Sequence, residues 1–295
     1  MIPANLAIAR LRRDLTVGRV VNIVLLTVVA LCFMVGQIID NHLADILLIL
    51  VLGVIWVTLG YQSLKGSRLA ARSPMLIAQG QFDLAEHEIE QALRAFSIFR
   101  TSKLLSLHHL ALLRHAQRRW HEAAELCRAL LRQRLGSLKG LSRQSRLILA
   151  DSLVEMGDVR GAHQAIASLY EERLSLGEAM NLLAVQLDYL WRVNAWAAMF
   201  AGISTKVQMA ELMNAATSAR LQAMLALAAK KVGRDDWSDY LRRRVELLAD
   251  VDELTKARPI LHELYRISTP GTQSPDPPTE TIVTTDRQTT ETKGE

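Results

Sequence analysis

Three short segments decide the fold: QGQFDLA at residues 79–85, QRRWHEA at residues 117–123 and MGDVRGA at residues 156–162. Each contains a turn, then a bulky apolar residue, and then an alanine three positions later. The alanines that end the segments, Ala85, Ala123 and Ala162, are almost equally spaced along the chain. Self-similarity at a nearly fixed period of about 40 residues is typical of repeat architectures.

Two weaker copies follow, at residues 194–199 and 235–240. The bulky residues that mark the five copies recur at nearly the same period; they are Phe82, Trp120, Val159, Trp196 and Trp237. Between them the chain is rich in Ala, Leu, Arg, Glu and Gln, without sustained alternation of apolar and polar residues. This composition and periodicity predict helices throughout residues 65–267, and therefore an all-α protein.

The pattern resembles the tetratricopeptide repeat family, in which each repeat is an antiparallel pair of helices. Gly80 and Gly157 match the family's turn glycine, and Ala85, Ala123 and Ala162 match its small residue at the start of the second helix. The fourth copy has Met199 at that position and the fifth has Tyr240. The resemblance implies an α-solenoid of about five helix pairs. A single pair cannot bury its apolar face, so several must stack.

The chain before the repeats holds two uncharged segments, VVNIVLLTVVALCFMVGQII at residues 20–39 and ILLILVLGVIWVTLGYQSL at residues 46–64. As helices they would each cover roughly 30 Å, the thickness of a bilayer core. The six-residue connector between them fits a tight turn. We therefore predict a transmembrane helical hairpin rather than a cleaved signal peptide, which would have a shorter apolar segment.

Basic residues set the expected orientation of this hairpin. Seven Lys or Arg residues flank it and the connector has none; the flanking residues are Arg10, Arg12, Arg13, Arg19, Lys65, Arg68 and Arg72. The positive-inside rule then places both termini and the repeats in the cytoplasm. Two spans followed by repeats also resemble, in plan only, the HemY-type proteins, which implies a bacterial inner (plasma) membrane.

The domain organisation follows from these segments. We predict a basic cytoplasmic segment at residues 1–19, the hairpin at 20–64, the repeat domain at 65–267 and a disordered tail at 268–295. The tail is rich in Thr, Pro and acidic residues and lacks apolar periodicity, so it cannot bury enough surface to fold.

No catalytic motif is present: there is no P-loop, dinucleotide fingerprint, nucleophile elbow, CxxC or HExxH. Four histidines, His108, His109, His115 and His121, lie close together in the sequence. They are expected to be groove or surface residues; a metal-binding or pH-sensing role is the less favoured alternative. We predict a protein that is not an enzyme and uses no cofactor.

Two surfaces are candidates for binding a ligand or partner, and the first follows from charge. Residues 100–146 carry eleven Lys or Arg against two Glu, within a chain of net charge +5. The predicted basic face consists of Arg114, Arg118, Arg119, Arg128, Arg132 and Arg134. It is most simply a solvated face, and contact with anionic lipid is the functional alternative. Only one Phe, Tyr or Trp residue, Trp120, lies between these arginines, so nucleic acid is a less favoured ligand.

The second surface is a partner groove on the first helices of the repeats, where the family binds peptides. Its expected residues are Leu105, His108, Leu112, His115, Gln144, Asp151, Glu155, Asp188, Trp191 and Arg192. The resemblance implies a membrane-anchored scaffold for protein–protein interaction on the cytoplasmic face. The alternatives are a subunit of a membrane-associated enzyme complex and a module that binds anionic lipid.

Overall fold

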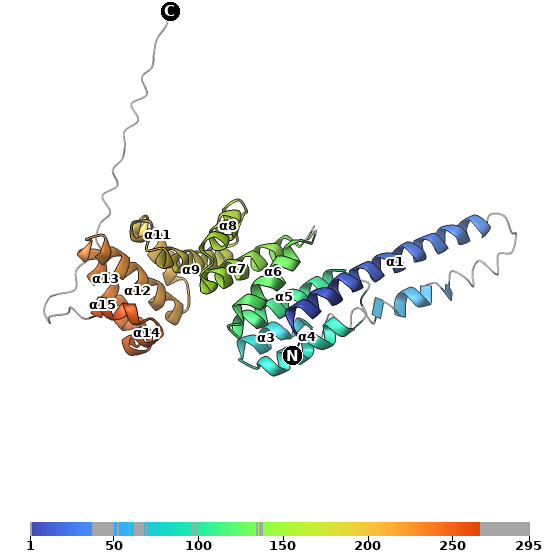
Figure 1. Ribbon diagram of the computed structural model, residues 1–295, viewed down its shortest axis with the longest axis horizontal. Coiled ribbons are helices and arrows are strands. Elements are labelled where there is room, and N and C mark those ends of the chain that lie inside the picture. The colour runs from blue at the N-terminus through green and yellow to red at the C-terminus, as the bar shows by residue number, and fades with distance from the viewer. Residues whose placement is uncertain are drawn as a thin grey trace, which may run out of the picture. The chain divides into compact units, whose positions relative to one another are not determined.

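The computed structural model describes residues 2–36, 50–51, 53–58, 60–61, 68, 70–95, 97, 100–133, 135 and 138–265. Every regular element in this part of the chain is a helix, which confirms the all-α prediction (Figure 1). The chain divides into two compact units, Met1–Tyr189 and Leu190–Glu295, and each is described by itself. The predicted tail and nine of the nineteen residues of the second predicted span lie outside the described residues.

The first unit begins with α1 (Ala4–Gly36). The helices that follow are α3 (Ser73–Ala78), α4 (Phe82–Arg94), α5 (Arg100–Ala116), α6 (Trp120–Leu131), α7 (Lys139–Met156), α8 (Val159–Tyr170) and α9 (Leu176–Arg192), whose last turn enters the second unit. Helices that follow one another from α3 to α8 pack together, and α5 also packs on α7.

Among the described residues, five turns between helices share one backbone geometry. In each turn, the residue two positions before the next helix has a positive φ; these are Gly80 (75°), Arg118 (60°), Gly157 (76°), Asn194 (55°) and Gly233 (75°). The following amide donates to the carbonyl five residues back at 2.8–2.9 Å, as Gln81 does to Leu76. This is the left-handed helix end that closes an antiparallel turn. The five positions follow one another at nearly equal intervals, so the repeat seen in the sequence is also a repeat of backbone geometry.

The turns correct the register expected for the fifth copy. The helix after Gly233 begins at Asp235, so the position of Phe82 and Trp120 is held by Asp235 and not by Trp237. The small residue three positions later is Ser238, which is buried, whereas Tyr240 was expected there. With this shift, Ala85, Ala123, Ala162, Met199 and Ser238 occupy equivalent positions, and each amide donates to the carbonyl four residues back.

The core of the first unit is a continuous apolar cluster that draws on α1 and on each helix from α3 to α9. α1 contributes Ala4, Ala7 and Leu11, all at most 3% exposed, and packs on α4, α5 and α6. The spacing of three and four residues places these side chains on one helix face. Residues 1–19, which were expected to be a basic cytoplasmic segment, therefore contribute side chains to the core. Their arginines lie between buried apolar residues.

The second unit centres on α12 (Ala215–Lys231). All residues from Leu221 to Ala229 are buried, as expected for a helix surrounded by others. Around it lie α10 (Trp196–Phe200), α11 (Ile203–Glu211), α13 (Asp235–Leu248) and α15 (His262–Tyr265); α14 (Val251–Ala257) and a 3-10 turn (Pro259–Leu261) complete the unit. α11 has no counterpart in the other copies, because the short α10 ends before Gly202 and a second helix starts there.

Candidate functional site

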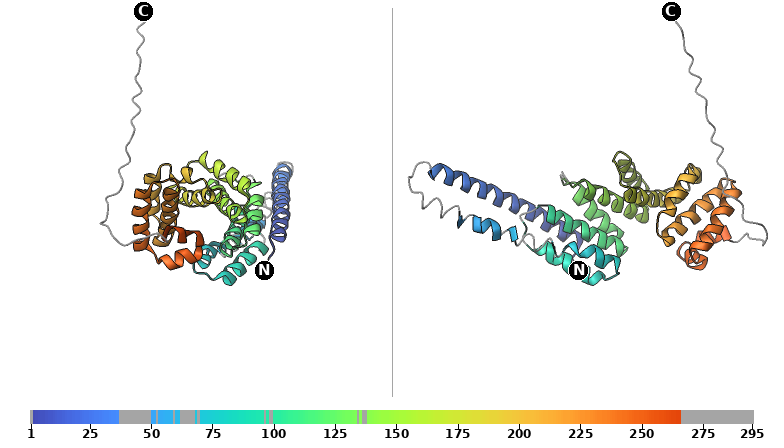
Figure 2. Two further views of the ribbon diagram at one scale, coloured as in Figure 1. Left: turned by 60° about the vertical axis from the view of Figure 1, so that its left-hand side comes forward. Right: turned by 180° about the vertical axis from the view of Figure 1, so that it is seen from behind.

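α1 leaves the first unit as an exposed apolar helix. Figure 1 and the right panel of Figure 2 show its second half extending beyond α3–α6. Within the described residues, Ala4–Leu31 is long and apolar enough to cross a membrane, with a mean hydropathy of 1.9 in its most apolar window, of which 6% is buried. A core helix of a soluble protein of this hydropathy would be mostly covered. Contiguous exposed apolar surface of this size marks an interaction with a membrane or a partner.

The described residues between 50 and 61 have the same character. They are helical, and Leu50, Ile55, Trp56 and Val57 are between 43% and 67% exposed. This segment extends from the unit in the same direction as α1 (Figure 1). The chain then returns to the unit, because Ala70 and Ser73 are both buried.

A buried ion pair holds the start of α1 on the repeats. Arg114 on α5 is fully buried and lies 2.8 Å from Glu86 on α4 and 3.1 Å from Glu122 on α6. Its Nη2 also donates to the carbonyl of Ile2 at 2.8 Å, while the Ile2 amide donates to Glu86 at 3.2 Å. Burial raises the pKa of Glu86, but the hydrogen bond and charge of Arg114 outweigh it, so that pKa is lowered overall. Glu86 is thus held ionised beside the guanidinium.

Arg114 therefore does not belong to a basic surface, and this part of the predicted basic face is wrong. The sequence placed it there by composition, because two of its partners, Glu86 and Ile2, lie 28 and 112 residues away. Lys103 is also buried: it is 2% exposed, pairs with Asp14 of α1 at 2.8 Å and donates to the carbonyls of Leu93 and Ala95. Both cations fasten α1 to the repeats.

The other arginines of the predicted basic face differ in their exposure and in their contacts with carboxylates. Three of its arginines, Arg118, Arg128 and Arg132, are exposed. Arg119 and the exposed Arg128 each contact a carboxylate, and Arg134 lies outside the described residues. The carboxylates belong to Glu122 and to Asp158, the latter 3.7 Å from Arg128. The positive charge counted in the sequence is therefore substantially compensated.

The residues expected to line the partner groove come from three helices. Leu105, His108, Leu112 and His115 are on α5, Gln144, Asp151 and Glu155 are on α7, and Asp188, Trp191 and Arg192 are on α9. The structure brings His115 and Asp151 together at 2.7 Å. It buries His108, whose Nδ1 lies 2.9 Å from the Ser145 hydroxyl. Leu105 and Leu112 pack against the core, and Gln144 is exposed.

The last groove residues divide between the units. Asp188 is buried in the first unit. Trp191 and Arg192 belong to the second unit, where Trp191 packs edge-on against Trp196, with ring centroids 5.4 Å apart, and Arg258 lies over its ring at 5.9 Å. Glu155, Asp188 and Arg192 also take part in polar or electrostatic interactions.

Polar contacts connect the first helices of successive pairs at the repeat period. Beside the His115–Asp151 and His108–Ser145 contacts, Ser73 lies 3.0 Å from His109, and Arg143 pairs with Glu178 at 2.8 Å. The partners are 35 to 37 residues apart in each case. Much of the polarity that the sequence assigned to a groove thus joins one helix pair to the next.

Burial also shifts the pKa of two titratable groups in the core. Desolvation, with the neighbouring charge of His109, lowers the pKa of His108 to about 4 against the opposing hydrogen bond from Gln144. Burial raises the pKa of the Cys127 thiol to about 12, which makes it an unreactive core residue. In the part of the chain that the structure describes, no three His, Cys, Asp or Glu side chains are arranged to hold a metal ion.

Sequence reasoning missed the attachment residues Ile2, Asp14, Glu86 and Lys103. A signal existed in the apolar positions 4, 7, 11 and 15, which recur every three or four residues between the arginines. No protein-family model, curated protein or solved structure matches the chain. The function of this chain is therefore inferred from the contacts described above.

Proposed function

We propose that this chain is a membrane-anchored helical-repeat scaffold that recruits a protein partner at the cytoplasmic face of a membrane. One observation carries the proposal: α1 is a single helix whose first turns are buried in the repeat core and whose second half is apolar and exposed. Such a helix connects a bilayer to the repeats without a flexible linker.

The same packing supports a two-span hairpin. Ile2 and Ala70 are both buried in the first unit, so the chain leaves the unit along α1 and returns to it before Ala70. If α1 crosses a bilayer, the chain must cross it again to come back. The basic residues on both sides of the hairpin favour the cytoplasm for the repeats and the termini, in the inner membrane of a bacterium.

The repeated turns and the contacts at the repeat period support a solenoid of the tetratricopeptide kind. Pairs of helices stacked in this way bury a common core and leave an extended face for a partner. Because the sequence carries none of the catalytic motifs considered above, recruitment is the role that we propose rather than catalysis.

A reporter in the 41–44 connector and one after residue 267 test the anchor in the full chain. We expect the first outside and the second inside, with the protein retained in membranes at alkaline pH. Recovery in the soluble fraction, or both reporters on one side, would contradict the anchor.

Recruitment is tested by a matched pair of variants, Gln144→Arg on α7 and Gln164→Arg on α8. Both side chains are exposed and the change is the same. Partners cross-linked to the full chain in membranes should be lost from the first variant and kept by the second. Because Gln144 also hydrogen-bonds the buried His108, the helix content of both variants is compared by circular dichroism. An identical partner set for both would contradict recruitment at the first-helix face.

A further inference from the structure

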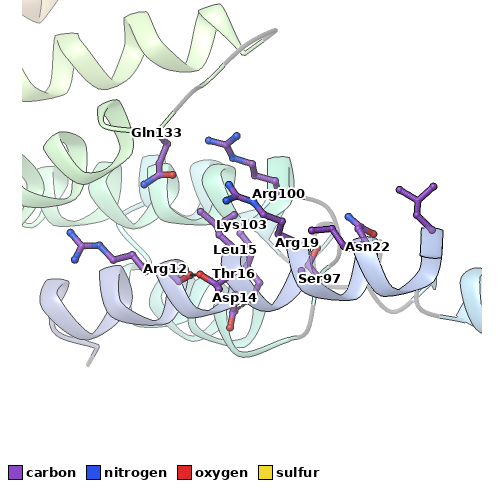
Figure 3. A pocket seen from close by; sticks show the side chains of 13 residues that line it. Arg12, Asp14, Leu15, Thr16, Arg19, Asn22, Ser97, Arg100, Lys103 and Gln133 are labelled. Carbon is purple, nitrogen blue, oxygen red and sulfur yellow. Dashed lines mark hydrogen bonds and ion pairs between the residues drawn. The ribbon is translucent and has the colours of Figure 1, made fainter. Parts of the chain in front are cut away.

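A cleft of about 610 Å³ opens where α1 leaves the repeats. It lies between α1, the start of α5 and the end of α6 (Figure 3). Its polar lining comes mainly from Arg12, Asp14, Thr16, Arg19, Asn22 and Arg100. Residues 12, 19, 23 and 26 of α1 all line it, and their spacing places them on one helix face.

The cleft carries uncompensated positive charge. Its one carboxylate, Asp14, pairs with Lys103, so these two charges cancel. Arg12, Arg19 and Arg100 remain; all three are exposed, and no ion pair joins them to a carboxylate among the described residues. In Figure 3 the side chains of Arg19 and Arg100 extend from their two helices to the same side of the cleft. Guanidinium groups arranged in this way bind phosphate oxygens well.

The far end of the cleft is apolar. Ile23 and Leu26 line it on the next turns of α1 and are 56% and 70% exposed. They continue into the exposed apolar half of the helix. A ligand that fills the cleft would therefore have an anionic group at one end and hydrocarbon at the other.

We propose that this cleft binds the headgroup of an anionic phospholipid, with its phosphate on Arg12, Arg19 and Arg100 and its acyl chains along Ile23 and Leu26. The inference rests on the proposed membrane anchor, which places this junction at the headgroup level. A basic pocket at that depth is a recurrent way to recognise an anionic lipid. The site differs from the predicted basic face, whose exposed arginines lie at and beyond the end of α5 and at the end of α6.

The test uses the full chain in nanodiscs of phosphatidylcholine, to which phosphatidylglycerol is added, with bound lipid counted by native mass spectrometry. The triple variant R12Q/R19Q/R100Q removes the cleft charge, and R118Q/R128Q/R160Q removes the same charge from exposed positions that do not line the cleft. Each basic residue near an anionic lipid contributes about fivefold. The first variant should therefore lose up to about a hundredfold in preference for phosphatidylglycerol, and the second should change by less than about fivefold.

Two outcomes would overturn the site: an unchanged preference in the cleft variant, or an equal loss in both variants. Glycerol phosphate at the same concentration should not displace the lipid; displacement would assign the site to a soluble phosphate instead. Because the chain is first inserted in phosphatidylcholine, failure to insert would contradict the anchor, whereas insertion without lipid preference would contradict only the cleft. Circular dichroism of both variants should match the parent, because the substituted side chains are exposed.

Discussion

The two halves of α1 share one helix and have opposite surroundings. From Ala4 to Leu15 a narrow apolar stripe is buried against α4–α6, and charged residues occupy the remaining faces. From Val20 to Leu31 no residue is charged, and the side chains are exposed or half-exposed on every face. An apolar stripe is covered by a protein neighbour on one side of the helix. A helix that is apolar on every face needs apolar surroundings on every side.

The difference shows how a membrane anchor can be built without a linker. The first half is held by directional contacts, with Arg114 and Lys103 buried against Glu86 and Asp14. The second half has no comparable polar contacts to the repeats among the described residues, and in the proposed anchor it would be buried in hydrocarbon. Damage to the first half should therefore uncouple the repeats from the anchor, and damage to the second half should leave the repeats folded.

The largest effect is expected from Arg114→Ala. The change leaves Glu86 buried without its cation and removes a donor from the Ile2 carbonyl. Losing one partner of a buried ion pair costs about 3–5 kcal/mol. Hydrogen exchange on the full chain in mild detergent should show loss of protection in residues 2–15 and in α4–α6.

Two further variants separate charge from packing at this site. Glu86→Leu with Arg114→Met removes both charges and should recover most of the lost protection. Arg118→Ala, one turn away and exposed, should change stability by less than about 0.5 kcal/mol. Equal effects at Arg114 and Arg118 would contradict the buried attachment.

Leu11→Ala and Leu26→Ala compare the two halves directly. Leu11 is 1% exposed in the repeat core and Leu26 is 70% exposed. Truncating a buried leucine costs about 2–5 kcal/mol through lost burial and the cavity left behind. In the same hydrogen-exchange experiment, protection of residues 2–15 and of α4–α6 should fall for Leu11→Ala and stay constant for Leu26→Ala. A drop for Leu26→Ala alone would reverse the assignment of the halves.

Acid should act on the first half only, because residues 20–31 contain no titratable side chain. α1 packs on α5, where the pKa of the buried His108 is lowered to about 4 from an unfolded value of 6.5. Between these values the unfolded chain binds more protons, so stability falls as the pH drops from 6.5 to 4, by up to about 3 kcal/mol. His108→Gln should flatten this dependence in urea titrations, and His121→Gln, whose parent side chain is 74% exposed, should not.

The sequence predicted what is local and periodic. The turns at Gly80 and Gly157 could be found because a left-handed helix end favours glycine. Arg118 and Asn194 occupy the same conformation without glycine, and these copies were found through Trp120 and Trp196. The fifth copy was misplaced because the bulky Trp237 resembled the expected aromatic residue, although Gly233 marks the turn.

Contacts between distant residues could not be predicted in this way. The sequence around Arg114 does not show that it is buried, because Glu86 and the Ile2 carbonyl, which its guanidinium contacts beside Glu122, come from other parts of the chain. For the same reason His108 and Asp151 suggested an open groove, although each contacts a residue about one repeat away. The cleft depends on α1 lying beside α5, which is also a long-range contact.

The smallest effect on stability is expected from Arg118→Gly. Arg118 lies four residues after Arg114, so this variant sharpens the contrast between the two arginines. Arg118 has a φ of 60°, a conformation that costs a residue with a side chain about 1–2 kcal/mol and costs glycine little. Arg118→Gly should therefore stabilise the first unit by about 0.5–1 kcal/mol after the greater freedom of glycine in the unfolded chain is subtracted. Gly157→Ala, at the equivalent position with a φ of 76°, should destabilise it by a similar amount, since its surroundings are open and only backbone strain changes. Opposite shifts in the unfolding temperature would establish that the two turns are equivalent, and a loss of stability in Arg118→Gly would mean that the arginine side chain makes a contact more valuable than the strain it imposes.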